Sequence, residues 1–440
     1  MRELIDYINS KVLEKIASLQ IFAVLTRIVA GLLTSKAIAV FIGAEGLALI
    51  GNLRNFVTAS QTTASAGLYK GIVKYIGQFK DTTSELSRVI STTFYTGFIT
   101  TVLVCLFCYL NANWINDLIF PNYNDYAYVI RIFAVALPFY ILNMFSFSII
   151  NGFSKYKILI VINIIGQLLS VSVTLILIYQ NKIDGALIAA VISESLIFLI
   201  TLVGIINRRS LVPLIKASMF SFDMLKKMRV YALMALFTSV LLPFVAIAIR
   251  THIIENIGYK DAGFWEAMTR ISKYYLMFVS SLIGLYLLPR FSEIKDNKEF
   301  RSVVFGFYKT IVPFLSIGLI LVYFLRKYIV LIVLTPEFQP VENLFLWQLL
   351  GDFVKVLALV IAYQFLAKKM FWHYVLTEAF LIITLYSTSI YFINLYDNIE
   401  GAVIAHFVSY VMYFSIILLI FGGSLFGLDG GKAEETKLKS

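Results

Sequence analysis

Long apolar runs separated by short polar segments dominate the chain. One helical bilayer crossing takes about 20 residues, and runs of about this length or a little more recur twelve times. They lie at about 16–43, 47–73, 89–110, 126–150, 158–180, 185–206, 229–254, 262–289, 302–325, 341–366, 372–395 and 400–422. Apolar and polar residues do not alternate in these runs, as they would in the strands of a membrane β-barrel. The pattern therefore predicts an all-α membrane protein with about 12 transmembrane helices.

The second half of the chain resembles the first half. The string IDGALIA at 183–189 matches the string IEGAVIA at 399–405. Two shorter matches, at almost the same spacing, join 121–123 with 336–338 and 78–81 with 293–296. Together these similarities indicate an internal duplication. The spacing corresponds to six spans, an even number, so both halves enter the membrane in the same sense, as in transporters with parallel repeats.

The duplication predicts the domain organisation. Two six-helix bundles, related by a pseudo-two-fold axis, are expected at 1–208 and 225–422, with a cytoplasmic linker at 209–224 and a cytoplasmic tail at 423–440. In transporters of this layout the substrate binds between the halves, which rock to expose the site to each side in turn. We therefore expect a central cavity.

Composition agrees with a membrane protein and excludes several other classes. Hydrophobic residues make up 60% of the 440 residues and charged residues 14%, against about 45–50% and about 25% in soluble proteins. A soluble enzyme, a disulfide-rich scaffold and a disordered chain are thereby excluded. Cys105 and Cys108 lie in an apolar run without further Cys or His nearby, so we interpret them as small apolar residues and predict no metal site.

The formal net charge of +11 is explained by membrane topology. Of the 37 Lys and Arg residues, 23 lie on one side of the predicted spans, four on the other side and ten within the spans. By the positive-inside rule, the side with 23 is cytoplasmic, which puts both termini in the cytoplasm. No nucleic-acid partner is needed to account for the charge.

Charged residues deep within the spans are the main functional candidates, because each costs at least about 2.5–3.5 kcal/mol near the bilayer centre on insertion scales. Lys70, Arg131 and Lys309 lie near span ends, where a long side chain reaches the head groups. The seven deeper cations are Arg27, Lys36, Arg54, Arg250, Arg270, Lys273 and Lys355. The acids at comparable depth are Glu194, Glu266, Asp352 and Glu378.

Helical spacing groups many of these residues. Arg54 begins a polar stripe that continues at i+4, i+7, i+8 and i+11. Glu266 and Arg270 are placed for an i,i+4 ion pair on a face that also carries Lys273. A third face carries Gln348, Asp352, Lys355, Leu359 and Tyr363.

Two interpretations compete for the buried charges. Internal salt bridges would account for Glu266–Arg270 and Asp352–Lys355, but not for seven cations against four acids. A cationic, water-filled cavity accounts for the surplus, and Arg binds phosphate oxygens through two parallel hydrogen bonds. We therefore predict an anionic, phosphorylated ligand. Trp265 is either an anchor at the membrane interface or a surface on which a sugar stacks.

Several strings resemble the Wzx-type flippases of the multidrug/oligosaccharidyl-lipid/polysaccharide exporter superfamily. In the second half they lie at 234–250, 263–294 and 344–368, and in the first half at 46–58 and 71–78. Among these flippases, the chain is most similar to those for lipid III of enterobacterial common antigen. The resemblance covers nearly the whole chain except about 425–440.

The resemblance implies transport of undecaprenyl-diphosphate-linked oligosaccharides, such as O-antigen repeat units, from the cytoplasmic to the periplasmic leaflet of the bacterial inner membrane. It implies that basic residues on the first, second and eighth spans bind the diphosphate, here Arg27, Arg54 and Arg270. Further cations of the same site would be Lys36, Arg250, Lys273 and Lys355. Trp265 and Tyr363 would contact sugar. The cations would be oriented, or an ion coupled, by Glu194, Glu266, Asp352 and Glu378.

Two other functions fit the sequence less well. A multidrug antiporter of the same superfamily would need acids in the cavity to bind cations, and here bases outnumber acids. A membrane enzyme such as a glycan polymerase would need a large periplasmic loop, and the outer loops are short. No catalytic residue or cofactor is predicted, and without a P-loop the drive would come from an ion or substrate gradient. The expected partners are the lipid-linked glycan, membrane lipids and a glycan polymerase or chain-length regulator.

Overall fold

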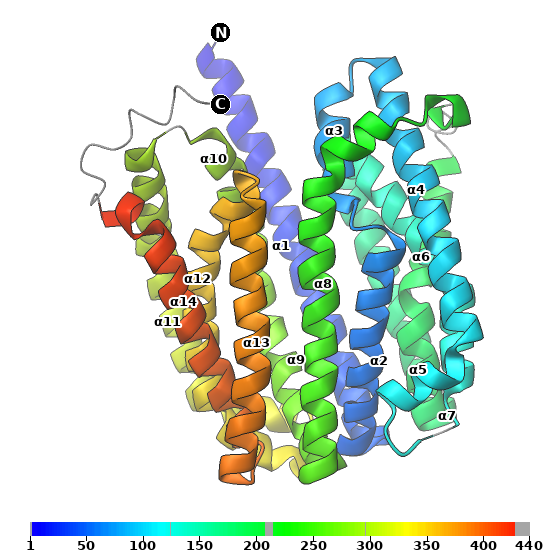
Figure 1. Ribbon diagram of the computed structural model, residues 1–440, viewed down its shortest axis with the longest axis vertical. Helices are drawn as coiled ribbons and strands as arrows, with labels where there is room; N and C mark the ends of the chain where they lie inside the picture. Colours follow the sequence, from blue (N-terminus) through cyan, green and yellow to red (C-terminus); the bar gives the residue numbers. More distant parts are fainter. Residues whose placement is uncertain (1, 124, 207–213, 295, 427–440) are drawn as a thin grey trace. The chain divides into compact units, whose positions relative to one another are not determined.

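The structure is a computed structural model that describes residues 2–123, 125–206, 214–294 and 296–426. In these ranges the regular structure is helical (Figure 1). The helices of the first half are α1 (Arg2–Phe41), α2 (Gly43–Ala64), α3 (Tyr69–Phe79), α4 (Thr83–Leu110), α5 (Ala112–Ile119), α6 (Ala127–Gly152) and α7 (Tyr156–Ile206).

The second half follows a short 3-10 turn, η2 (Ala217–Met219). Its helices are α8 (Phe222–Asn256), α9 (Tyr259–Leu282), a π-helical turn η3 (Ile283–Leu287), α10 (Leu288–Glu293), α11 (Asn297–Val333), a 3-10 segment η4 (Pro336–Leu344), α12 (Phe345–Ala367), α13 (Phe371–Tyr396) and α14 (Glu400–Phe426).

These helices confirm the predicted all-α membrane fold. Nine helical segments of the described chain are long and apolar enough to cross a bilayer. One of them, 156–203, contains two predicted spans, because α7 is interrupted at Lys182, whose φ of 47° and ψ of −117° are not helical. The two remaining predicted spans are α2 and α9, which carry the polar and charged residues discussed above.

One local expectation is wrong. The predicted span 47–73 is not one helix: α2 ends at Ala64, and α3 starts at Tyr69 after a turn in which Ala66 and Gly67 have positive φ. The described part of the predicted linker contains the 3-10 turn η2 and the first residues of α8.

By packing, the chain divides into two compact units, 1–251 with 333–335, and 252–332 with 336–440. Most of α8 belongs to the first unit, where Met224, Met228 and Ala232 pack against Ile72 and Ile76 of α3 in one apolar core. Compactness therefore groups α8 with the first half, whereas the repeat groups it with the second. The predicted boundaries of the two six-helix bundles stay a prediction.

The duplication is visible in the last helix pair of each half. Lys182 and Asp397, which lie at almost the spacing of the repeat, both have positive φ (47° and 49°) at the turn before the final helix. Gly185 and Gly401 follow in the matched strings. A Cβ atom at Gly185 would lie 1.8 Å from the carbonyl oxygen of Leu177, and one at Gly401 would lie 2.4 Å from that of Phe392. The final helix of each half thus approaches the backbone of the preceding helix at a glycine.

Replacing either glycine by alanine should destabilise the protein. The new methyl group would overlap backbone atoms that cannot rotate away, and overpacking of this kind costs about 1–3 kcal/mol. Gly185→Ala and Gly401→Ala should each lower the thermal unfolding temperature of detergent-purified protein, followed by size-exclusion chromatography after heating. Gly422→Ala on α14 is the matched control, because its Cβ would enter open space. Unfolding temperatures equal to that of the control would contradict the close packing at both turns.

Candidate functional site

Arg54 lies on the side of α2 that is less closely packed against the rest of the protein. Most of α2 is buried, whereas Arg54 and Thr62 are exposed in part and Thr58 is exposed. The hydroxyl groups of Thr58 and Thr62 donate to the carbonyl oxygens of Arg54 and Thr58, at 2.8 and 2.9 Å. A polar side of a helix in an apolar environment is typical of a helix that lines a water-filled cavity.

Glu194 contacts this helix from α7. Its carboxylate accepts a hydrogen bond from Nε2 of Gln61 at 3.2 Å. Gln61 and Ser65, the other members of the predicted stripe, are buried. The stripe is therefore divided between an open part around Thr58 and a part that packs within the unit.

Arg250, at the end of the α8 segment in the first unit, is 1% exposed. Its Nη1 donates to the side-chain oxygen of Asn52 on α2 at 2.6 Å. The amide nitrogen of Asn52 donates to the carbonyl oxygen of Ile119 at 2.9 Å, which fixes the amide orientation and leaves its oxygen facing the guanidinium. Asn52 holds Arg250 in a buried place without neutralising its charge.

The other two candidate cations of the first unit lie on α1. Arg27 is exposed, and Lys36 is half-buried and donates to the carbonyl oxygen of Leu334. Leu334 directly follows α11, and a lysine at a helix C-terminus satisfies a carbonyl group that the helix itself leaves free. Lys36 thus has a structural partner, whereas Arg27 remains exposed on the helix surface.

In the second unit, the predicted pair of Glu266 and Arg270 is confirmed. The Nε of Arg270 lies 2.7 Å from Oε1 of Glu266, and both side chains are 4% exposed. Within the described residues, Nη1 and Nη2 of Arg270 donate no hydrogen bond. These two nitrogens form the end of the guanidinium group, and their spacing suits hydrogen bonds to two oxygens of one phosphate.

The predicted shared face of α9 is only partly correct. Glu266 and Arg270 are buried, but Lys273 is exposed, and Trp265 and Thr269 are half-buried. Trp265, Thr269 and Lys273 are spaced at i, i+4 and i+8, so they share the side of α9 that is more open. α9 therefore has a buried ion pair on one side and a basic, aromatic side next to it.

Asp352 on α12 is completely buried and has four hydrogen-bond partners. The hydroxyl groups of Ser272 and Tyr275 on α9 donate to it, each at 2.5 Å, and Nε2 of Gln348 donates at 3.2 Å. Nε2 of His406 on α14 lies 3.0 Å from the other carboxylate oxygen. This number of donors can stabilise a carboxylate in a place that excludes water.

Lys355, one turn further along α12, does not pair with Asp352. Its ammonium group lies 5.2 Å from the centre of the Tyr410 ring, a cation–π distance. Tyr410 also contacts His406, with 4.8 Å between ring centres. The Asp352–Lys355 salt bridge that the alternative interpretation offered is not formed, because Lys355 contacts Tyr410 and Asp352 contacts His406, both on α14.

Glu378 on α13 completes this cluster. It is buried, and its Oε1 accepts a hydrogen bond from the hydroxyl group of Tyr413 at 2.8 Å. Tyr363 lies half-buried on α12. The second unit thus contains a polar network of Ser272, Tyr275, Gln348, Asp352, Lys355, Glu378, His406, Tyr410 and Tyr413.

Sequence reasoning missed Asn52 and three residues of α14. An uncharged Asn in an apolar helix gives a weak signal, because its importance depends on Arg250, which lies in the other half of the sequence. The α14 residues had a usable signal: His406, Tyr410 and Tyr413 are spaced at i, i+4 and i+7, which places one polar face on an otherwise apolar helix.

Two curated proteins are similar to the chain over most of its length. The chain is 29% identical to the Lipid III flippase of Escherichia coli (strain K12) over 401 residues, which cover 90% of this chain and 95% of the relative. The Lipid III flippase of Shigella flexneri matches with the same identity and coverage.

Solved structures of multidrug transporters share the fold. An inward-facing MATE family transporter of the MOP superfamily matches with a TM-score of 0.73 at 13% identity, over 91% of this chain and 95% of that chain. An outward-facing one matches with a TM-score of 0.65 at 13% identity, over 92% and 96%. These likenesses show the two-bundle fold of 12 helices. The family model described as "Polysaccharide biosynthesis protein" matches residues 41–343, and the chain, a multi-pass membrane protein, belongs to this family.

Proposed function

We propose that the protein is a flippase that moves undecaprenyl-diphosphate-linked oligosaccharide units from the cytoplasmic to the periplasmic leaflet of the bacterial inner membrane. The observation that carries the proposal is the buried Arg270, whose Nε donates to Glu266 while Nη1 and Nη2 donate no hydrogen bond within the described residues. The names of the relatives support the same substrate class. Both termini would be cytoplasmic, as the distribution of Lys and Arg indicates.

In this proposal the cations bind the diphosphate and let it leave the head-group region. Arg54 and Arg270 would contact the phosphate oxygens directly, with Arg27 and Arg250 adding positive charge. Lys36, Lys273 and Lys355 would contribute charge at longer range. The hydrogen-bond donors of these side chains would replace the water molecules that hydrate the diphosphate. The polar head group could then cross the membrane while the polyprenyl chain stays in lipid.

Aromatic side chains would hold the glycan. Trp265 precedes Glu266 on α9 and is half-buried, so part of its ring is open for stacking on a sugar. Tyr363 is half-buried on α12. The glycan itself would set which partner polymerase or chain-length regulator receives the product.

The carboxylates would couple transport to an ion gradient. Asp352 has four hydrogen-bond partners within one unit, including His406, and Glu378 has Tyr413. Glu266 and Glu194 would instead orient basic and amide groups. The protein would be a transporter without catalytic residues.

An ion-coupled multidrug antiporter is the second candidate function. The buried acids Asp352 and Glu378 favour it, because an antiporter for cationic drugs needs carboxylates. The surplus of cations within the spans opposes it. Protection of cells against cationic dyes, measured alongside glycan export, separates the two functions.

Loss of the guanidinium group at Arg270 or Arg54 should strongly reduce transport. Charge-assisted hydrogen bonds are worth about 1.5–3 kcal/mol, so Arg270→Ala and Arg54→Ala should each lower the initial rate about 10–100-fold. The assay uses liposomes with an undecaprenyl-diphosphate-linked oligosaccharide and measures the fraction that reaches the opposite leaflet. Arg270→Lys keeps the charge but loses the fork, and should recover only part of the rate.

Arg88→Ala is the control for this assay, because Arg88 forms an exposed ion pair with Glu85 at the start of α4. It should transport like the wild type. Wild-type transport rates in both Arg54→Ala and Arg270→Ala would contradict the proposal that these residues bind the diphosphate. No transport by the wild type under imposed proton and sodium gradients would instead turn the assignment toward the antiporter.

Asn52 and Arg250 should act as one unit. Asn52→Ala leaves a buried guanidinium without its 2.6 Å partner, so it should lower both thermal stability and transport. Because the two residues are in contact, the double variant Asn52→Ala/Arg250→Ala should be destabilised by less than the sum of the single changes. The measurement is a double-mutant cycle of unfolding temperatures. Strict additivity would show that the hydrogen bond contributes nothing to the fold.

Neutralising Asp352 should uncouple transport from ions. Asp352→Asn keeps the shape and some of the hydrogen bonds but cannot carry a charge. Transport down a substrate gradient should remain, whereas stimulation by an imposed proton or sodium gradient should disappear. Asp397→Asn, at the exposed turn before α14, is the control. Unchanged stimulation in Asp352→Asn would exclude this carboxylate from coupling.

A further inference from the structure

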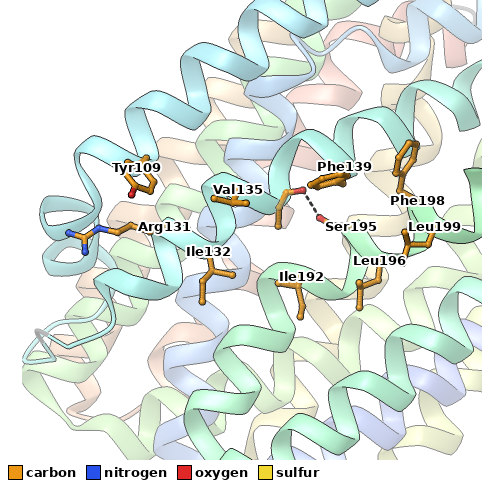
Figure 2. A pocket seen from close by; sticks show the side chains of 11 residues that line it. Tyr109, Arg131, Ile132, Val135, Phe139, Ile192, Ser195, Leu196, Phe198 and Leu199 are labelled. Atoms are coloured by element: carbon orange, nitrogen blue, oxygen red, sulfur yellow. Dashed lines mark hydrogen bonds between the residues drawn. The ribbon is translucent and has the colours of Figure 1, made fainter.

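An apolar groove of about 570 Å³ lies on the first unit between α4, α6 and α7 (Figure 2). Its walls are Ile132, Val135, Ala136, Phe139, Ile192, Leu196, Phe198 and Leu199. Ser195 also lines it, but its hydroxyl group donates to the carbonyl oxygen of Ala136 at 2.9 Å, so it offers little polarity to a ligand. Val135 is 63% exposed, so the groove is open to the surroundings.

One end of the groove is polar. Arg131 and Tyr109 lie together there, away from Phe198 and Leu199 (Figure 2). Arg131 is exposed, and its hydrogen bond to Asn113 is long, at 3.5 Å. From Arg131 to Phe139 the groove follows α6 for about 12 Å at 1.5 Å per residue. Half of the hydrocarbon thickness of a bilayer is about 15 Å. The groove therefore matches the depth of one leaflet, with the arginine at head-group level.

The second unit has its own groove at related positions. It has a volume of about 340 Å³ and lies between α11 and α12. Phe324 and Leu350 of this groove correspond, at the spacing of the repeat, to Tyr109 and Val135 of the first. The remaining walls are Ser316, Leu319, Ile320, Tyr323, Leu346, Leu349 and Phe353.

This second groove also has an arginine beside it. The guanidinium carbon of Arg326 lies 4.2 Å from the centre of the Tyr323 ring, and Nη1 donates to the carbonyl oxygen of Tyr323 at 2.8 Å. A flat guanidinium stacked on an aromatic ring has a fixed orientation. The first groove is lined by Arg131 itself, whereas Arg326 contacts the second groove through Tyr323 of its wall, and Leu346 stands at the repeat position of Arg131.

Arg131 and Arg326 lie on the side of the predicted spans that carries few Lys and Arg residues. Basic residues are scarce at this end of the predicted spans, where the sequence places only Lys182, Lys260, Arg326 and Lys327 between the apolar runs and Arg131 near a span end. Both arginines of this group accompany a groove, and arginine is the cation that binds a phosphate with two parallel hydrogen bonds. A ligand that is complementary to such a groove has a hydrocarbon chain, which matches the apolar walls, and a phosphate group, which matches the arginine.

We propose that each groove binds one anionic phospholipid of the outer leaflet, with an acyl chain along the apolar walls and its phosphodiester on Arg131 in the first unit and Arg326 in the second. The duplication favours a phospholipid over the polyprenyl chain of the substrate. A substrate molecule has one polyprenyl chain and one diphosphate, whereas two separate grooves, one on each unit, fit a ligand that is abundant in the bilayer. The proposal does not depend on what the protein transports, and the outer leaflet follows from the orientation given by the charge distribution.

Photo-crosslinking tests the proposal on the full-length protein in vesicles. The probes are a phosphatidylglycerol and a phosphatidylcholine that carry the same photoactivatable acyl chain. Peptide mass spectrometry then locates adducts. The expected result is several-fold stronger labelling of segments 132–139, 192–199, 316–324 and 346–353 by the anionic probe. Val135→Trp should reduce labelling of the first groove, whereas Leu103→Trp, at an exposed position of α4 outside the groove, should not.

Charge variants assign the phosphate to each arginine. Arg131→Gln should remove the preference for phosphatidylglycerol in the first groove and leave the second unchanged, and Arg326→Gln should do the reverse. Lys327→Gln and Lys182→Gln should change neither groove. Equal labelling by both probes in the wild type, or an unchanged preference in both arginine variants, would overturn the proposal. Displacement of the probe by undecaprenyl phosphate at concentrations where unlabelled phosphatidylglycerol has no effect would also overturn it, in favour of the polyprenyl chain.

Discussion

The free energy of keeping charged side chains inside an apolar bilayer constrains the whole molecule. Each such group must find a partner, reach water or bind a ligand. In the described structure some of these charged groups have a protein partner, and others lie on an exposed side of a helix. Lys36 reaches a carbonyl oxygen at a helix end, and Arg54 remains on the more open side of α2. The polarity of α2 and α9 follows from this constraint, and it is also the reason that these two helices are the least hydrophobic of the twelve spans.

The two units satisfy their buried charges with different chemistry. In the first unit, the buried Arg250 donates a hydrogen bond to the neutral amide of Asn52. In the second unit, Asp352 is surrounded by hydroxyl, amide and imidazole groups. The duplicated fold has therefore diverged in its electrostatics. In our proposal the second unit serves both roles, because Arg270 would bind the diphosphate and Asp352 would couple transport to an ion.

Sequence patterns predicted the features that depend on neighbours in the chain. The twelve spans and the Glu266–Arg270 pair follow from helical periodicity. The break between α2 and α3 was missed because no proline marks it, and the positive φ of Ala66 is imposed by the surrounding structure. Gln348, on the same face of α12 as Asp352, was found by periodicity, whereas Ser272, Tyr275 and His406 were missed because they lie on α9 and α14. Periodicity shows which residues share a face, but it does not show which face of another helix packs against it.

The glycine contacts at Gly185 and Gly401 have a consequence for biogenesis. Each joins a helix to the one directly before it, so the contact closes only a short loop and has a small entropic cost. Contacts between near neighbours in sequence also form quickly. The first half can complete its closing hairpin while the second half is still on the ribosome. Each half can thus close its last helix hairpin early, although the packed core of the first unit is completed only when α8 has been made.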